Sequence, residues 1–354
     1  MTHKFLSHQG LSSLVADLLA AKTRVIAPVC AKDDPEQIDY QLIQCFEEAT
    51  FGVRLPRRSL KEFFLPPTEV LLHYKQTKAG VEIREVPTVA PPQVIFGAMP
   101  CDVAGLATVD KVMDWDYRDE LWFGRREAST IVSFLCSAMD ATCFCTAVGL
   151  GPESASGSDV LFTPVDGGYV ANLITPRGEA LLHNYGSKAS DAQLATAQEK
   201  QRDARRKVEP NLPAVSAELG GWLASNFDHP TWKTIALRCH GCGACAAVCP
   251  TCHCFDIVDE HESADEGVRR RNWDSCQTSL FTLHASGHNP RASQSERFRQ
   301  RIQHKFSIYP SRFGEILCTG CGRCSRVCPG GMDLPTILGE LVNLSQAKPE
   351  VSGQ

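Results

Sequence analysis

Apolar and polar segments alternate through the first part of the chain in a way that is typical of an α/β domain. Short apolar runs predict buried strands at residues 24–29, 93–97 and 129–135, and an amphipathic pattern predicts a helix at 11–21. Helical stretches separate these strands, which favours one sheet with helices packed against it. We expect the strand at 93–97 to end in a turn at Pro100-Cys101-Asp102. A further apolar segment at 160–173, broken by Asp166-Gly167-Gly168, predicts a β-hairpin.

The pattern changes after residue 189. The stretch 190–208 is highly polar and predicts a solvated helix that bridges two domains, and prolines follow it at 210 and 213. A short apolar helix at 214–226 then leads into a segment rich in cysteine. We therefore predict an α/β domain over 1–210, an α-rich domain over 211–345 and a flexible tail over 346–354.

The second predicted domain contains the same cysteine pattern twice, and each copy reads C-x2-C-x2-C-x3-C-P. The copies are Cys239, Cys242, Cys245 and Cys249 with Pro250, and Cys318, Cys321, Cys324 and Cys328 with Pro329. In bacterial ferredoxins this run holds [4Fe–4S] clusters, and its fourth cysteine ligates the other cluster. A structural zinc site is the alternative, but such sites usually combine two separated cysteine pairs. The crossover assigns Cys239, Cys242, Cys245 and Cys328 to cluster A, and Cys318, Cys321, Cys324 and Cys249 to cluster B.

The spacing suits a cube-shaped cluster. Three cysteines in steps of three can wrap a loop around one face of the cube, because the intervening glycines permit tight turns. The step to the fourth cysteine is about one helical turn, so that thiolate points toward the neighbouring cluster. We therefore predict a ferredoxin-like dicluster core in the α-rich domain. Positive charge at Arg238, Arg323 and Arg326 is expected to favour the reduced clusters.

Composition narrows the remaining possibilities. The chain has 354 residues, 17 cysteines and a net charge of −5, which fits two domains and gives no indication of nucleic-acid or membrane binding. The N-terminal residues lack the apolar core of a secretory signal, and no apolar run approaches the roughly 18 residues of a membrane span. We therefore expect a cytoplasmic protein, because a reducing compartment leaves thiolates free to bind metal. No G-x-G-x-x-G after a strand and no P-loop is present, so no flavin or nucleotide is expected in this chain.

A second set of cysteines lies in the first predicted domain. Cys101 and Cys136 each follow a predicted strand, and Cys143 and Cys145 come soon afterwards. If the strands are parallel neighbours, the four thiols can meet at one edge of the sheet and hold a third [4Fe–4S] cluster. The alternative is that they are buried structural thiols, because free cysteine often serves as a small hydrophobe.

Five cysteines remain. Three of them follow the first motif, at Cys252, Cys254 and Cys276. The residues that could complete a metal site with them are histidines, namely His253, His284 and His288. We favour packing around cluster A over ligation for these three thiols. The other two, Cys30 and Cys45, are interpreted as ordinary thiols.

Longer segments carry a family resemblance. They are Cys249-Pro-Thr-Cys-His-Cys-Phe-Asp-Ile257, Trp273-Asp-Ser-Cys276, 280–291, 296–302 and 304–306, with Phe96-Gly-Ala-Met-Pro-Cys-Asp102 and Cys143-Phe-Cys145 in the first domain. Over about 24–340 the chain resembles the iron–sulfur beta subunit of cytoplasmic sulfhydrogenases, the NAD(P)-linked nickel–iron hydrogenases. It is equally similar to the iron–sulfur subunit of anaerobic sulfite reductase. Ala98-Met99 departs from the more polar pair expected beside Cys101.

The resemblance implies an electron-transfer subunit of a soluble multi-subunit oxidoreductase, with no catalytic residue of its own. Its [4Fe–4S] clusters would relay electrons between a flavoprotein subunit that reacts with NAD(P)H and a catalytic hydrogenase or sulfur-reducing subunit. The resemblance also favours the third cluster. The alternatives are the iron–sulfur subunit of an anaerobic sulfite reductase, a self-sufficient iron–sulfur reductase that binds substrate at Cys252, Cys254 and Cys276, and a redox sensor or scaffold.

Overall fold

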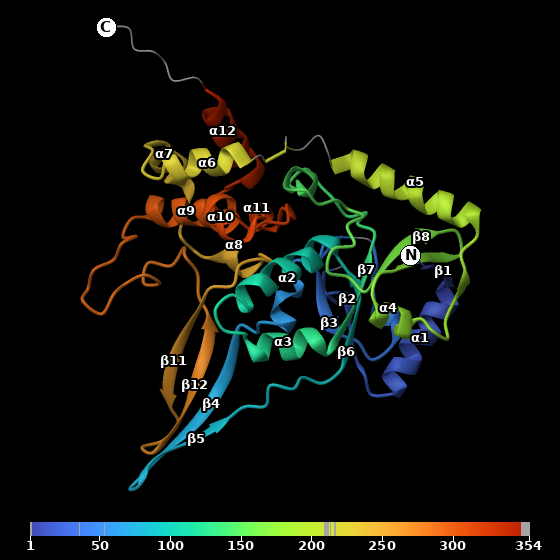
Figure 1. Cartoon of the computed structure of the whole chain (residues 1–354), viewed down its shortest axis with the longest axis horizontal. Coiled ribbons are helices and arrows are strands. Elements are labelled where there is room, and N and C mark those ends of the chain that lie inside the picture. The colour runs from blue at the N-terminus through green and yellow to red at the C-terminus, as the bar shows by residue number, and fades with distance from the viewer. Residues whose placement is uncertain are drawn as a thin grey trace.

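A computed structural model describes residues 2–34, 36–52, 54–208, 212, 214–215 and 217–347. An α/β body and a helical C-terminal part lie side by side, and a narrow second sheet projects away from their junction (Figure 1). The expected domain boundary at residue 210 lies outside the described residues, so the division into domains stays a prediction.

The body is built on a mixed sheet whose strand order, within the described residues, is β10-β1-β9-β8-β7-β6-β2-β3. Its central strands run parallel: β2 (Arg24–Cys30), β6 (Gln93–Ala98), β7 (Ser129–Phe134) and β8 (Val160–Val165). The outer strands pair antiparallel: β1 (Thr2–Ser7), β3 (Ile38–Leu42), β9 (Gly168–Leu173) and β10 (Ser187–Lys188). Every residue of β6 is buried, as expected for a strand covered on both faces. The predicted strands and the β8–β9 hairpin are confirmed.

Helices cover this sheet. They are α1 (His8–Ala20), α2 (Pro100–Met113), α3 (Glu120–Glu127), α4 (Pro176–Leu181) and α5 (Asp191–Val208), with short 3₁₀ turns η1 (Phe46–Glu48), η2 (Leu60–Phe63) and η3 (Cys145–Val148). The predicted turn at Pro100 is wrong, because Pro100 begins α2, where the first helical turn needs no proline N–H. Helix α5 was expected to be solvated and to bridge domains. It packs instead on β8 and β9, and Ala197, Ala204 and Val208 form its buried side.

The projecting sheet joins distant parts of the chain. Its strands are β4 (Thr68–Thr77), β5 (Gly80–Glu85), β11 (Phe255–His261) and β12 (Glu266–Trp273), in the order β11-β12-β4-β5 within the described residues. The central pair, β4 with β12, is antiparallel. Arg271 on β12 is buried and pairs with Glu69 on β4 and with Asp119. This sheet therefore ties the cysteine-rich segment of the sequence to the α/β body.

The C-terminal part is helical around the cysteine motifs. Its helices are α6 (Ala217–Ser225), α7 (Thr231–Ile235), α8 (Ala244–Ala247), α9 (Gln294–Gln303), α10 (Tyr309–Phe313), α11 (Arg323–Arg326) and α12 (Leu334–Gln346), with the turns η5 (Ala236–Arg238) and η6 (His304–Ile308). A capping box of Ser293 and Glu296 starts α9, whose buried side carries Phe298, Arg301 and Ile302.

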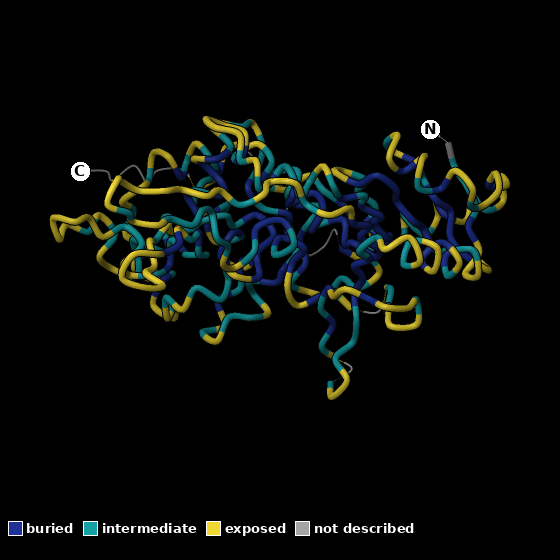
Figure 2. The backbone as a smooth tube through the Cα atoms, turned by 90° about the horizontal axis from the view of Figure 1, so that it is seen from below, coloured by how far each residue is buried: buried dark blue, intermediate teal, exposed yellow. Residues whose placement is uncertain are grey.

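The short helix predicted at 214–226 is confirmed as α6. Helix α12 extends to Gln346, and the rest of the expected tail, from Lys348, lies outside the described residues. Figure 2 shows that buried backbone runs through the middle of the molecule, whereas the loop tips are exposed. None of the described helices is long and apolar enough to cross a membrane.

Candidate metal centres

The first motif and the end of the second surround one cavity. Its wall includes Cys239, Cys242, Cys245 and Cys328. Cys239 follows η5, Cys245 lies in α8, and Cys328 comes two residues after α11. Helices α8 and α11 pack against each other, which brings Cys328 to the first motif. The structure therefore places together the set predicted for cluster A, including the cysteine borrowed from the second motif.

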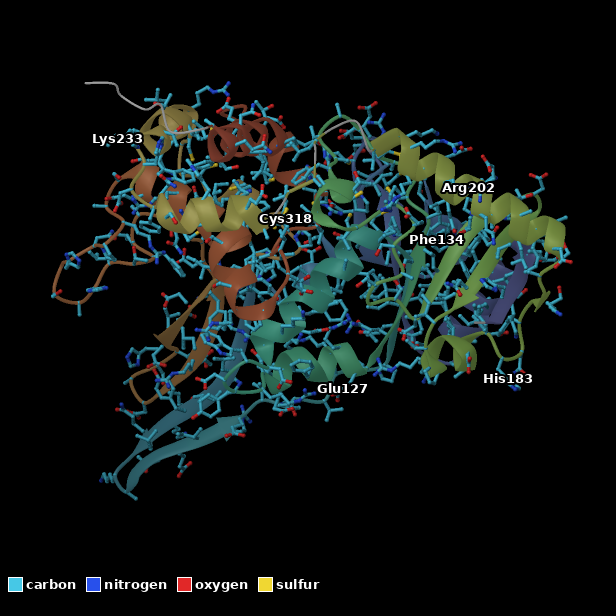
Figure 3. The ribbon with its side chains drawn as sticks, turned by 45° about the horizontal axis from the view of Figure 1, so that its top comes forward. Glu127, Phe134, His183, Arg202, Lys233 and Cys318 are labelled. Atoms are coloured by element: carbon cyan, nitrogen blue, oxygen red, sulfur yellow. The ribbon has the colours of Figure 1, made fainter. Side chains whose placement is uncertain are left out.

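The set predicted for cluster B is also gathered in one place. Cys318, Cys321 and Cys324 each lie close enough to the thiol of Cys249 to interact with it electrostatically. Cys249 itself is buried. Figure 3 shows Cys318 at the junction of the C-terminal helices with the α/β body. Cys249 of the first motif thus lies near the three cysteines of the second motif, and the crossover ligation stays a prediction.

Four cysteines of the α/β body line a second cavity: Cys101, Cys136, Cys143 and Cys145. The strands that precede the first two of them, β6 and β7, are parallel neighbours, so these thiols meet beyond one edge of the sheet. Burial raises the pKa of Cys136 and of Cys145 to about 12. As free thiols they would be neutral, and a bound metal would deprotonate them. The shared cavity is compatible with a third cluster, and ligation by these residues stays a prediction.

The second motif packs directly on the loop that carries Cys143 and Cys145. The N–H of Phe144 donates to the carbonyl oxygen of Gly320 over 2.7 Å. Gly322 adopts a φ of +70°, and a Cβ there would come within 2.6 Å of the Thr142 carbonyl oxygen. Only glycine fits this left-handed, crowded position. The loop of the third site and the second motif are therefore one packed unit.

Two arginines expected to supply charge to the clusters are paired with carboxylates instead. Arg323 is 2% exposed and binds the buried Asp102, whose other partner is the Tyr40 hydroxyl at 2.8 Å. Arg326 pairs with Asp140 at 2.8 Å. Arg238, the third, is exposed to solvent, which screens its charge. Arg323 and Arg326 also lie near cysteines of the proposed clusters: Nη1 of Arg323 is 4.0 Å from the Cys101 sulfur, and Nη1 of Arg326 is 3.9 Å from the Cys143 sulfur. The expectation that these arginines favour the reduced clusters stays a prediction.

Arg301 and Lys305 supply further buried positive charge. Arg301 is 5% exposed, lines the cavity of cluster A, and its Nε and Nη2 have no hydrogen-bond partner among the described residues. Lys305 is 2% exposed, and its Nζ lies 3.4 Å from the Cys249 sulfur. Burial lowers the pKa of each cation, but the neighbouring thiolates outweigh it and raise both pKa values. A buried charge is costly unless an opposite charge meets it.

The buried cations indicate whether the charge around the cysteines suits an iron–sulfur cluster. Thiolate-ligated clusters are anionic, and Arg301 lines the cavity where one is expected while keeping two unsatisfied donors. The residues therefore fit the group. The sequence alone did not single out Arg301 and Lys305, although both lie within 296–306, where segments carry the family resemblance. Their spacing of four residues on a helical stretch could have shown that they lie on the same side of the helix.

The last group of cysteines makes two different pair contacts. Cys252 contacts Cys249, whereas Cys254 contacts Cys276, and Cys252 and Cys254 both line one surface pocket. Of the candidate histidines, His253 packs its ring on His304, and the His284 and His288 rings face each other. Among the described residues, no group of three or more His, Cys, Asp or Glu side chains is arranged to hold a single metal ion.

Comparison with known proteins agrees with this geometry. Residues 238–332 match the family described as a 4Fe-4S dicluster domain. Sulfhydrogenase 2 subunit beta from Pyrococcus furiosus is 29% identical over 286 residues, which cover 79% of this chain and 82% of that protein. The resemblance to an iron–sulfur beta subunit is confirmed. The C-terminal part of the chain is a 4Fe-4S dicluster domain, and [4Fe–4S] is its cofactor.

Proposed function

We propose that this chain is the electron-transfer subunit of a cytoplasmic, multi-subunit oxidoreductase. It relays electrons between a flavoprotein subunit that reacts with NAD(P)H and a catalytic hydrogenase or sulfur-reducing subunit. The relay consists of cluster A, cluster B and a third cluster at Cys101, Cys136, Cys143 and Cys145. Each [4Fe–4S] cluster supplies a one-electron carrier. The similarity to Sulfhydrogenase 2 subunit beta supports a role as a subunit over that of an independent enzyme.

The observation that carries the proposal is that cysteines of the cluster B set also line the cavities of the other two cysteine groups. The cavity of cluster A is also lined by Cys324, which belongs to the set of cluster B. The cavity of the third site is also lined by Cys321, another member of that set, and Cys321 contacts Cys101. Cluster B therefore lies between the other two. The order A, B, third cluster is a continuous path through the middle of the molecule.

Both ends of this path reach the surface. At one end Cys242 of the cluster A set is exposed. At the other end Leu55 and Met139 line both the third site and a larger polar pocket of about 630 Å³, to which Arg54 and Arg57 contribute. A separate partner could therefore exchange electrons at each end. This arrangement suits a relay between two subunits better than a single buried redox centre.

The side chains around the path would set the cluster potentials. The Gln294 amide donates to the Cys239 sulfur over 3.1 Å, and the Lys305 ammonium lies 3.4 Å from the Cys249 sulfur. Donors and cations of this kind stabilise the added negative charge of a reduced cluster, so they raise its potential. The chain thus positions the carriers and adjusts their driving force.

Iron analysis of the full-length chain, reconstituted without oxygen, tests the proposal. We expect about twelve irons per chain, four per cluster, and about eight in the Cys143→Ser/Cys145→Ser variant. The matched control is Cys30→Ser/Cys45→Ser, which should keep all of its iron. Eight irons in both the wild type and the Cys143/Cys145 variant would return these thiols to a structural role.

A second measurement tests the role of the chain. The isolated chain should bind no flavin and should not oxidise NAD(P)H, whereas purification from its host should recover flavoprotein and catalytic subunits with it. Turnover of a sulfur substrate by the purified chain with an artificial electron donor would favour the self-sufficient reductase instead. An associated catalytic subunit of the sulfite reductase type would favour the iron–sulfur subunit of that enzyme.

A further inference from the structure

The relay leaves a contacting pair of cysteines unused. Cys254 directly precedes β11, and Cys276 lies three residues after β12. Phe255 pairs with Trp273 across the two strands, and the N–H of Asp274 donates to the Cys254 carbonyl oxygen over 3.1 Å. The base of this hairpin therefore brings Cys254 and Cys276 together, and their thiols are hydrogen-bonded to each other.

We propose that Cys254 and Cys276 form a redox-active pair that interconverts between two thiols and a disulfide and exchanges electrons with cluster A. The proposal adds a two-electron centre to the one-electron relay, and it rests on the proposed function for its electron supply. The pair could hold two electrons for a partner whose chemistry needs both, such as hydride transfer from a nicotinamide.

The pair is connected to the cluster A set by a glutamine. The Gln277 side-chain amide donates to the Cys276 sulfur at 3.7 Å, and the Gln277 side-chain oxygen lies 3.7 Å from the Cys239 sulfur. Cys276 also lies close enough to Cys245 to interact with it electrostatically. The surface pocket beside Cys254 and the cavity of cluster A are both lined by Cys242, Gly243 and Ala244.

The two thiols differ in pKa. The hydrogen bond from Cys254, with that from Gln277 and the nearby Arg301 charge, lowers the pKa of Cys276 to about 6 although burial opposes it. The same hydrogen bond and burial raise the pKa of Cys254. Cys276 is therefore the nucleophilic thiolate, because thiolates and not thiols form disulfides.

Protons have a route to the pair. Cys254 lines a surface pocket together with Lys61, Trp273, Ser275 and the exposed Cys242. On oxidation the S–S bond would form, both sulfurs would release any protons they carry through this pocket, and cluster A would accept the two electrons one at a time. On reduction the two electrons would return, the S–S bond would break, and the sulfurs would take protons back. The step balances with the relay as the only electron donor and acceptor.

Differential alkylation of the full-length, iron-loaded chain tests the pair. The chain is equilibrated without oxygen in dithiothreitol buffers of graded potential, quenched with N-ethylmaleimide and analysed by peptide mass spectrometry. We expect Cys254 and Cys276 to lose alkylation together, with a tenfold change in their ratio for about every 30 mV, as a two-electron couple requires. Cys30 and Cys45 should be alkylated throughout, and so should Cys276 in the Cys254→Ser variant.

Coupling to the relay is measured by counting electrons. The oxidised wild type, titrated with reduced methyl viologen, should take up two electrons more per chain than Cys254→Ser/Cys276→Ser of equal iron content. An equal uptake would overturn the coupling, and alkylation of both thiols at every potential would overturn the pair. Loss of about four irons from the double variant would show that the two cysteines are ligands and would also overturn the proposal. If the reconstituted wild type bound no iron and the pair still titrated, the proposed function and the coupling would be disproved, but the disulfide would not.

Discussion

The two cysteine motifs have the same spacing but different surroundings. In the first motif His240 and Cys242 are exposed, and the nearest atom to a Cβ at Gly243 would be 3.7 Å away. In the second motif the equivalent Thr319 and Gly322 are buried against the loop that carries Cys143 and Cys145. One repeated sequence pattern therefore produces a loop that faces solvent and a loop that is enclosed by the α/β body.

This difference assigns different roles to the two clusters. A cluster on the exposed loop would lie where a partner protein can approach it. A cluster on the enclosed loop would exchange electrons with its neighbouring clusters. We infer that cluster A is an entry or exit point and cluster B an internal carrier. Substitutions at equivalent positions of the two motifs, and at the cations beside them, can separate the two roles.

The largest effect is expected from the crossover cysteines. Cys249→Ser and Cys328→Ser should each remove one cluster, about four irons, but not the same one. Combining Cys249→Ser with Cys318→Ser should cost no further iron, because both residues belong to the cluster B set. Combining Cys249→Ser with Cys239→Ser should remove about eight irons. The reverse result, measured by iron analysis of the two double variants, would show that each motif binds its own cluster.

Equivalent glycines should differ in stability. Gly243→Ala and Gly322→Ala both place a side chain at positive φ, which costs roughly 1–2 kcal/mol. Gly322→Ala must also displace the Thr142 backbone, which adds about 1–3 kcal/mol of overpacking. Anaerobic denaturation of the iron-loaded variants should therefore show a clearly lower stability for Gly322→Ala. Equal losses would mean that the second motif is not packed against the third site as described.

The buried cations should affect the clusters separately. Arg301→Met should lower the potential of cluster A most, and Lys305→Met that of cluster B. Losing a charge-assisted hydrogen bond of about 1.5–3 kcal/mol corresponds to roughly 60–130 mV for one electron. Arg301→Lys should restore part of the shift, and Arg326→Met, whose charge is already balanced by Asp140, should change little. Potentiometric titrations followed by electron paramagnetic resonance measure all four, and equal shifts in Arg326→Met and Arg301→Met would contradict the assignment.

The smallest effect concerns the order of iron loss. Because Cys242 is exposed and its equivalent Cys321 is partly enclosed, a soluble chelator should remove the first four irons faster than the next four. Those irons should come from cluster A. The measurement is chelation kinetics in Cys328→Ser, which lacks that cluster and should lose the fast phase. A fast phase that persists in this variant would place the accessible iron elsewhere.

The sequence by itself determined the [4Fe–4S] clusters of the C-terminal part and the central strands of the main sheet, β2, β6, β7 and β8, with β9. Cysteine spacing follows from the shape of the cluster, which is local chemistry, so the motif is visible without a structure. The buried runs at β6 and β7 are equally local, because strands covered on both faces need continuous apolar sequence. The sequence predicted a turn at Pro100, where helix α2 begins. Proline suits both a turn and the first turn of a helix, so the sequence alone does not distinguish them.

Only the tertiary structure decided which charges and thiols act together. Arg323 and Arg326 lie within the second motif, yet their charges are balanced by Asp102 and Asp140, far away in the sequence. Arg301 and Lys305 are distant from the motif cysteines in sequence and still lie beside them. The pairing of Cys254 with Cys276 depends on the register of β11 and β12. Electrostatic balance is set by distance through space, which spacing along the chain does not reveal.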